Sequence, residues 1–206
     1  MKTFVKALFA ICILGCFAFT INTNSTKETI KVVIDAGHGG KDSGQIVKGI
    51  TEKEVVYQIT QKINELHQNK NVEIFFSRPN NEFVSLEKRV EFINTIQPDL
   101  VISLHANGHP QDETKKGMEI YFSNKNKFSK ENFEYGGQLS GIFIFSSAQQ
   151  VEIKSANFTI LSKVNSPALM LELGFLTNPE ERAYLTSTEG QTEVANLILK
   201  FINEIE

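Results

Sequence analysis

The stretch that decides the fold is Lys31-Val32-Val33-Ile34-Asp35-Ala36-Gly37-His38-Gly39-Gly40. Its first six residues are mostly apolar and rich in β-branched side chains, which predicts a buried strand. The glycines that follow predict a turn, and they let the backbone beside His38 approach a ligand closely. The stretch therefore predicts a strand that ends in a candidate binding site.

Short β-rich runs alternate with helical stretches in the rest of the chain. Helices are predicted, from apolar spacing, at 52–67, 85–96, 132–146 and 189–205, and strands at 31–36, 72–76, 100–104, 118–122, 157–161 and 168–173. This alternation is typical of a single α/β domain, with a mostly parallel twisted sheet of about six strands flanked by helices. In such sheets, ligands bind outside the carboxyl ends of the strands.

The first 24 residues have the pattern of a signal peptide. Lys2 and Lys6 precede an apolar run from Ala7 to Ile21, which is shorter than the roughly 20 residues that a membrane-spanning helix needs. We therefore expect export to the periplasm or cell envelope, with residues 25–30 as a linker and 31–206 as the catalytic domain. An uncleaved membrane anchor and a lipoprotein signal at Cys16 are the alternatives for this segment.

Composition restricts the class of protein. Hydrophobic residues make up 41% of the 206 residues and charged residues 22%, which is typical of a globular protein. The net charge of −3 argues against a nucleic-acid partner, because such proteins need a basic face. Both cysteines lie in the first 24 residues, so the mature domain has no disulfide and no thiolate metal ligand. We expect a monomer.

Three residues are candidate metal ligands. His38 follows the first predicted strand, Glu52 begins the first helix, and His105 follows the third strand. Two histidines and a glutamate are a common catalytic zinc set that leaves one coordination position open. Spacing alone leaves Glu54 open as the carboxylate ligand instead.

Glu172 lies in an otherwise apolar predicted strand, residues 168–173. A buried carboxylate must be paired, protonated or near a metal ion, since an unpaired buried charge is costly. Desolvation would raise its pKa toward the range useful for a general base. The alternative is that Glu172 lies at the solvent end of an edge strand.

Four motifs in this order resemble those of a known family. They are Val33-Ile34-Asp35-Ala36-Gly37-His38-Gly39-Gly40 with Glu52-Lys53, then Ser77-Arg78 with Leu86 and Arg89, then Ser103-Leu104-His105-Ala106-Asn107, and Leu171-Glu172-Leu173-Gly174-Phe175-Leu176-Thr177-Asn178. The chain is similar to the zinc-dependent N-acetylmuramoyl-L-alanine amidases of the Amidase-3 type. The resemblance implies zinc bound by His38, Glu52 and His105, with Glu172 as the catalytic acid and base. It also implies peptidoglycan as the substrate, cut between N-acetylmuramic acid and L-alanine.

The same residues also suggest other classes of protein. A phosphate-binding loop does not fit, because Asp35 stands where its first glycine should be. A zinc carboxypeptidase or deacylase acting on another amide, and a non-catalytic peptidoglycan-binding module, are the alternatives. His109 is a further histidine, expected at the rim of the cleft or in solvent. The sequence identifies no activator protein.

Overall fold

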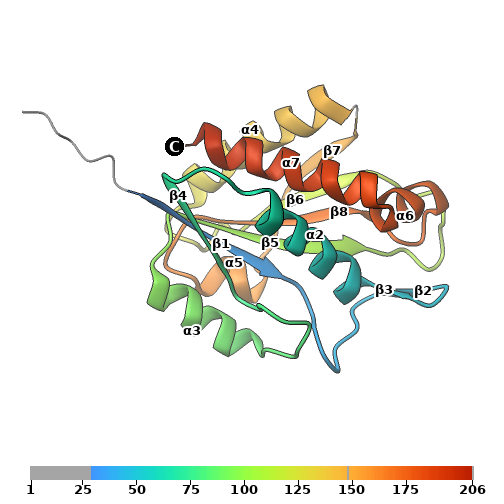
Figure 1. Ribbon diagram of the computed structural model, residues 1–206, viewed down its shortest axis with the longest axis horizontal. Coiled ribbons are helices and arrows are strands. Elements are labelled where there is room, and N and C mark those ends of the chain that lie inside the picture. The colour runs from blue at the N-terminus through green and yellow to red at the C-terminus, as the bar shows by residue number, and fades with distance from the viewer. Residues whose placement is uncertain (1–28, 148, 206) are drawn as a thin grey trace, which may run out of the picture.

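The computed structural model describes residues 29–147 and 149–205, which form one central sheet with helices on both faces (Figure 1). The strands of the sheet are β1 (Ile30–Ala36), β4 (Val72–Phe76), β5 (Leu100–Asn107), β6 (Met118–Phe122), β7 (Val151–Ser155) and β8 (Ala168–Phe175). The helices are α2 (Glu52–Leu66), α3 (Leu86–Ile96), α4 (Ser129–Ser147), α5 (Thr159–Lys163), α6 (Pro179–Thr186) and α7 (Thr188–Glu204). A small hairpin, β2 (Ile46–Val47) and β3 (Ile50–Thr51), precedes α2.

The six strands lie in the order β4-β1-β5-β8-β6-β7. Strands β4, β1, β5 and β8 run parallel, β6 is antiparallel to β8, and β7 is parallel to β6. The prediction of a mostly parallel α/β sheet is confirmed. The carboxyl ends of β1, β5 and β8 therefore meet at one edge of the sheet, where polar side chains from distant parts of the chain can converge.

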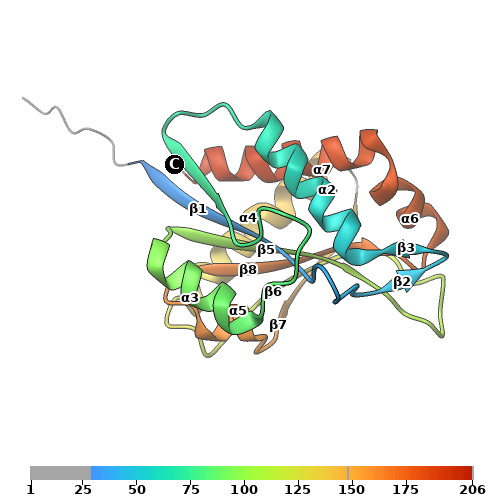
Figure 2. The same ribbon diagram turned by 60° about the horizontal axis from the view of Figure 1, so that its bottom comes forward.

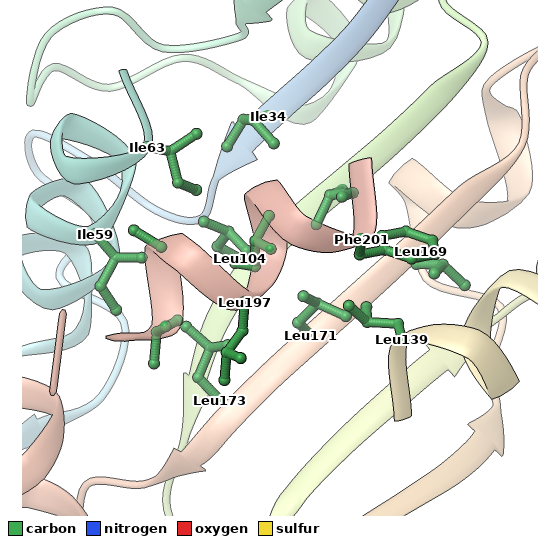
Figure 3. Packing of buried hydrophobic residues seen from close by; sticks show 14 of the residues in the cluster. Ile34, Ile59, Ile63, Leu104, Leu139, Leu169, Leu171, Leu173, Leu197 and Phe201 are labelled. Atoms are coloured by element: carbon green, nitrogen blue, oxygen red, sulfur yellow. The ribbon is translucent and has the colours of Figure 1, made fainter. Parts of the chain in front are cut away.

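Each face of the sheet has its own apolar cluster. The larger one packs beneath α2, α4 and α7, and Figure 3 shows Leu197 and Phe201 of α7 over Leu104 and Leu171 of the sheet. The smaller one lies beneath α3 and α5 on the opposite face (Figure 2). Because side chains alternate along a strand, the residues of β5 and β8 that do not enter the larger cluster point to the α3 and α5 face.

The predicted helices are confirmed within one to three residues at each end. The Ser85 side chain accepts a hydrogen bond from Lys88 N and caps α3. Helix α4 forms although it contains Gly136, Gly137 and Gly141. Its buried side chains, Leu139 and Phe143 among them, pack in the larger cluster, and tertiary packing outweighs the low helix propensity of glycine.

The strand predicted at 157–161 is wrong. Residues from Thr159 onward form helix α5, and the strand lies earlier, at Val151–Ser155. The β-branched Thr159 and Ile160 suggested a strand, but Ile160 and Leu161 are both buried against the smaller cluster, which a helix turn allows. Strand β7 was missed because its alternation, Val151 and Ile153 against Glu152 and Lys154, is short and only half-buried. Helix α6 and the β2–β3 hairpin were also not predicted.

The predicted signal peptide, residues 1–24, and most of the predicted linker lie outside the described residues. Strand β1 begins at Ile30, one residue before the predicted start of the domain. None of the helices in the described part of the chain has the length and apolar character needed to span a bilayer.

Candidate active site

His38, Glu52 and His105 come together at the carboxyl edge of the sheet. One potential ligand atom from each residue lies within 4.8 Å of the others. Glu52 lies between the two imidazoles: its Oε2 is 3.0 Å from His38 Nε2, and its Oε1 is 2.9 Å from His105 Nδ1. The predicted ligand set is thus one spatial cluster, formed from three separate parts of the chain.

Glu52 is the buried member of this cluster, with 4% of its surface exposed. It begins α2 directly after the β2–β3 hairpin, and its carboxylate accepts hydrogen bonds from Gln45 N and Ala106 N. Burial alone would raise the pKa of Glu52, but the imidazoles of His105 and His38 hold it well below its usual range. Glu54, the alternative from spacing, instead accepts a bond from Thr51 Oγ1 at the exposed start of α2.

Asp42 orients the His38 ring. Its Oδ2 lies 3.0 Å from His38 Nδ1, so that Nε2 faces Glu52. A carboxylate behind a histidine in this way fixes the ring orientation that a metal ligand needs. Sequence reasoning did not identify Asp42, although it stands only four residues after His38 in the glycine-rich turn.

The glycines of this turn leave space that the site requires. A Cβ atom on Gly37 would lie 2.4 Å from Cε1 of His105, and one on Gly44 would lie 2.3 Å from Oε2 of Glu52. His38 itself has a φ of 59°, which is uncommon for a residue with a side chain. The turn therefore holds His38 in a strained backbone conformation. A side chain at Gly37 or at Gly44 would collide with His105 or with Glu52.

Two buried arginines hold the backbone of this turn through hydrogen bonds to its carbonyl groups. Arg78 donates to the carbonyl oxygens of Ala36 and Gly37, and Arg89 donates to the carbonyl oxygen of His38. Arg89 also pairs with the buried Asp35, at 2.8 Å between Nη1 and Oδ1. Both arginines belong to the motifs noted in the sequence, and the structure shows that they brace the backbone around His38.

Glu172 lies on the same face of the sheet as His105 and beside it, because these two residues are register partners on β8 and β5. Strand β8 lies between β5 and β6, so the edge-strand alternative is wrong. Glu172 is partly buried, and its Oε2 has no hydrogen-bond partner among the described residues. Burial raises the pKa of Glu172 to about 7, and the nearby carboxylates add to the effect while His105 opposes it.

Glu119 extends the polar surface beyond Glu172. The two are register partners on β6 and β8. Glu119 Oε2 accepts hydrogen bonds from Asn107 Nδ2 at 3.0 Å and from Tyr121 Oη at 2.8 Å, while Oε1 pairs with Lys154 Nζ. This network was not predicted, because its members come from three strands and each is unremarkable alone.

His109 is not part of the cluster. It follows β5 and its N–H donates to Thr177 Oγ1, while its Nδ1 is buried without a hydrogen-bond partner in the part of the chain that the structure describes. His109 was expected at the rim of the cleft or in solvent, and its buried Nδ1 excludes a fully solvated side chain.

Comparisons with known proteins show the family to which this chain belongs. The Amidase_3 family model, described as N-acetylmuramoyl-L-alanine amidase, matches residues 32–204. The chain belongs to this family. The amidase family resemblance inferred from the four motifs is thus confirmed, and with it the assignment of the chain as an enzyme.

Individual relatives of this amidase span most of its length. The uncharacterized protein YqiI of Bacillus subtilis (strain 168) is 30% identical over 174 residues, which cover 84% of this chain and 82% of that protein. A putative N-acetylmuramoyl-L-alanine amidase of Buchnera aphidicola subsp. Acyrthosiphon pisum is 26% identical over 219 residues, with 83% and 92% covered. The crystal structure of N-acetylmuramoyl-L-alanine amidase from Clostridium difficile 630 superposes with a TM-score of 0.80 at 27% identity, over 86% of this chain and 96% of that chain.

Proposed function

We propose that this amidase is zinc-dependent and hydrolyses the amide bond between N-acetylmuramic acid and L-alanine in peptidoglycan. In this proposal His38, Glu52 and His105 hold the zinc ion, and Glu172 is the general acid and base. The observation that carries the proposal is the unpaired buried oxygen of Glu172 beside a cluster of two imidazoles and one carboxylate.

The residues present fit a catalytic zinc ion. Two imidazole nitrogen donors and one carboxylate match a site with one open coordination position, and Asp42 supplies the carboxylate behind His38 that such ligands commonly have. The cluster places a nearly buried carboxylate between two imidazoles. A bound zinc ion would supply Lewis acidity, polarising the scissile carbonyl and lowering the pKa of a water molecule.

Glu172 is suited to move the proton in this reaction. Its raised pKa, about 7, lets the carboxylate accept a proton near neutral pH and release it again. It would accept the proton of the water that attacks the lactyl carbonyl carbon. As the carbon–nitrogen bond breaks, it would donate that proton to the departing amine of L-alanine. The products are a glycan strand with a free lactyl carboxylate and a peptide with a free amine.

Export of the protein, which the sequence of residues 1–24 predicts, would favour a substrate in the cell wall. The signal-like residues 1–24 would bring residues 31–206 to the cell envelope as a monomer, where peptidoglycan lies. Daughter-cell separation or wall turnover is the process in which such a cut would serve.

Product analysis tests the proposal. Zinc-loaded protein should release peptides with a new L-alanine amine from purified peptidoglycan and leave the glycan chains unbroken, and chelation should stop this release until zinc is restored. New reducing ends, or newly exposed D-amino acids, would identify a glycosidase or a peptidase instead. Binding to peptidoglycan with no product at any zinc concentration would indicate a non-catalytic module.

A further inference from the structure

Three well-exposed apolar side chains flank a groove beside the metal cluster. Phe83, Leu86 and Phe158 are 45%, 48% and 41% exposed. The groove has a volume of about 630 Å³ and runs from His38 and His105 toward the starts of α3 and α5. We name it the α3–α5 groove. Apolar side chains gathered around an open groove mark a binding surface rather than chance exposure.

The Phe158 ring is held in a defined position. It packs edge-on against Tyr121, with 5.3 Å between the ring centroids, and the Tyr121 hydroxyl is held by Glu119. Phe83, a second aromatic residue of the lining, lies beneath the ammonium group of Lys41, at 4.7 Å from its ring centroid. The groove is therefore lined by two aromatic rings together with His38 and His105 of the candidate metal cluster.

Charge distinguishes this groove from a second one on the other side of Glu172. The described residues that line the α3–α5 groove include three carboxylates, Asp35, Asp42 and Glu87, and no lysine. Their one guanidinium, Arg89, is occupied by Asp35 and by backbone carbonyl groups. Asp35 is in turn paired with Arg89, and Asp42 with His38, so Glu87 is the carboxylate left outside these pairs. With no lysine and no free guanidinium among its described lining residues, the groove offers an anionic ligand no cationic partner.

The second groove, of about 440 Å³, lies along the starts of β6 and β7 and begins at Glu119, the register partner of Glu172. It is lined by Lys115, Lys116 and Lys154, against the two carboxylates Glu119 and Glu152. Lys154 is already paired with both of these carboxylates, so the exposed Lys115 and Lys116 are the cations that a ligand with free carboxylates would meet on this side.

From this asymmetry we infer the direction in which the substrate lies, an inference that rests on the proposed function. The α3–α5 groove binds the N-acetylmuramoyl saccharide, and the peptide stem extends across Glu119 toward the lysines. A sugar ring is uncharged and presents apolar C–H faces that pack on aromatic and aliphatic side chains, whereas a peptide stem ends in a free carboxylate. Phe158 is then the residue that recognises the sugar.

The first test measures binding without catalysis. The probe is a peptide-free oligosaccharide of alternating N-acetylglucosamine and N-acetylmuramic acid, titrated into the zinc-loaded protein by calorimetry. Phe158→Ala should weaken binding about tenfold, which corresponds to a loss of about 1.4 kcal/mol of binding free energy. Leu86→Ala, a change at an exposed apolar residue that also lines the groove, should weaken binding as well.

Two control variants distinguish a loss of saccharide binding at the groove from a general loss of folded protein. Phe145→Ala removes an aromatic ring that is 90% exposed, on α4 at the other face of the sheet, and should leave binding unchanged. Lys115→Gln, in the second groove, should also leave oligosaccharide binding unchanged. Equal affinity of the wild type and Phe158→Ala for the oligosaccharide would overturn the inference.

The second test compares two substrates with the same scissile amide, a muramoyl peptide and a lactyl peptide that lacks the sugar ring. Phe158→Ala should raise KM about tenfold for the first and leave both KM and kcat unchanged for the second. Equal losses on both substrates would place the peptide in the α3–α5 groove and overturn the inference. Failure of the wild type to cut either substrate would refute the proposed function alone, because the calorimetric test still decides where the saccharide binds.

Discussion

Glu172 and His105 are register partners on the neighbouring parallel strands β8 and β5, so their side chains lie on the same face of the sheet. His105 belongs to the candidate metal cluster and Glu172 does not. The Oε2 atom of Glu172 has no hydrogen-bond partner in the described part of the chain. The proposed reaction requires this arrangement, in which one strand carries a metal ligand and the next carries a carboxylate that is free to exchange protons.

Glu172→Gln should keep zinc and fold but lose turnover. The amide has the shape of the carboxylate yet cannot accept a proton, and general acid–base groups typically contribute about 10²–10⁴-fold. We expect a loss near the upper end, because one residue serves both proton transfers. The measurement is turnover on muramoyl peptides together with zinc content.

Glu54→Gln is the matched control for that change, since Glu54 is exposed, lies outside the candidate metal cluster and accepts a hydrogen bond from Thr51. Its turnover should stay near that of the wild type. Loss of zinc from Glu172→Gln would make Glu172 a ligand, and near-normal turnover would move the base to another residue, with His109 the next candidate.

His38→Ala, Glu52→Ala and His105→Ala should each weaken zinc retention strongly, because three protein ligands leave little redundancy. Asp42→Asn should lower zinc affinity less, by about 10–100-fold, because it changes only the group behind His38. Competition with a chromogenic chelator measures both effects. Asp112→Asn, an exposed loop carboxylate bonded to Thr114, is the control and should change nothing. An unchanged affinity in Asp42→Asn would show that the His38 ring is oriented by other contacts.

Gly37→Ala should damage the metal cluster without any change in charge. The added Cβ would lie 2.4 Å from His105 Cε1, so the imidazole must move away from Glu52. We expect weakened zinc retention, measured as above. Gly137→Ala makes the same chemical change on α4, where nothing lies within 4 Å of the new atom, and should stabilise the helix by up to about 1 kcal/mol. Similar zinc affinity in the two variants would mean that the turn adjusts freely.

Asp35→Asn should destabilise the fold by about 3–5 kcal/mol at pH 7, because it leaves the buried Arg89 without its partner. Burial alone would raise the pKa of Asp35, but Arg89 and the hydroxyls of Ser77 and Ser103 hold it below its usual value. The stability from this lowered pKa is therefore fully present above about pH 4 and is lost as the pH falls through the folded pKa.

Urea unfolding at pH 7 and at pH 3 measures this difference, which should shrink at the lower pH because the unfolded chain binds a proton at Asp35 before the folded protein does. Glu65→Gln removes the exposed ion pair with Lys62 and should cost less than about 1 kcal/mol at either pH. A difference between wild type and Asp35→Asn that stayed constant with pH would argue against a charged Asp35 in the folded protein.

A helix or strand could be predicted from the sequence when the pattern of its own residues was long enough to identify it. The helix at residues 52–66 was predicted because apolar residues repeat on one face along its sequence. The strand at 168–173 was predicted because its run is almost entirely apolar, and it is buried on both faces. Strand β7 and helix α5 were misassigned because both are five residues long, and the packing of Ile160 and Leu161 decided their conformation.

By itself, the sequence determined which residue types stand near the strand ends: the glycine-flanked His38, Glu52 at a helix start, His105, and a carboxylate in the apolar run around Glu172. His105 was expected after the third strand, but it lies within β5, which runs to Asn107. Only the tertiary structure decided their mutual geometry. Strand order placed β8 beside β5, and the register then set Glu172 next to His105. The same pairing assembled Asn107, Glu119 and Lys154 into one network. Hydrogen bonds between strands far apart in the chain set these distances, and no short-range pattern in a sequence encodes them.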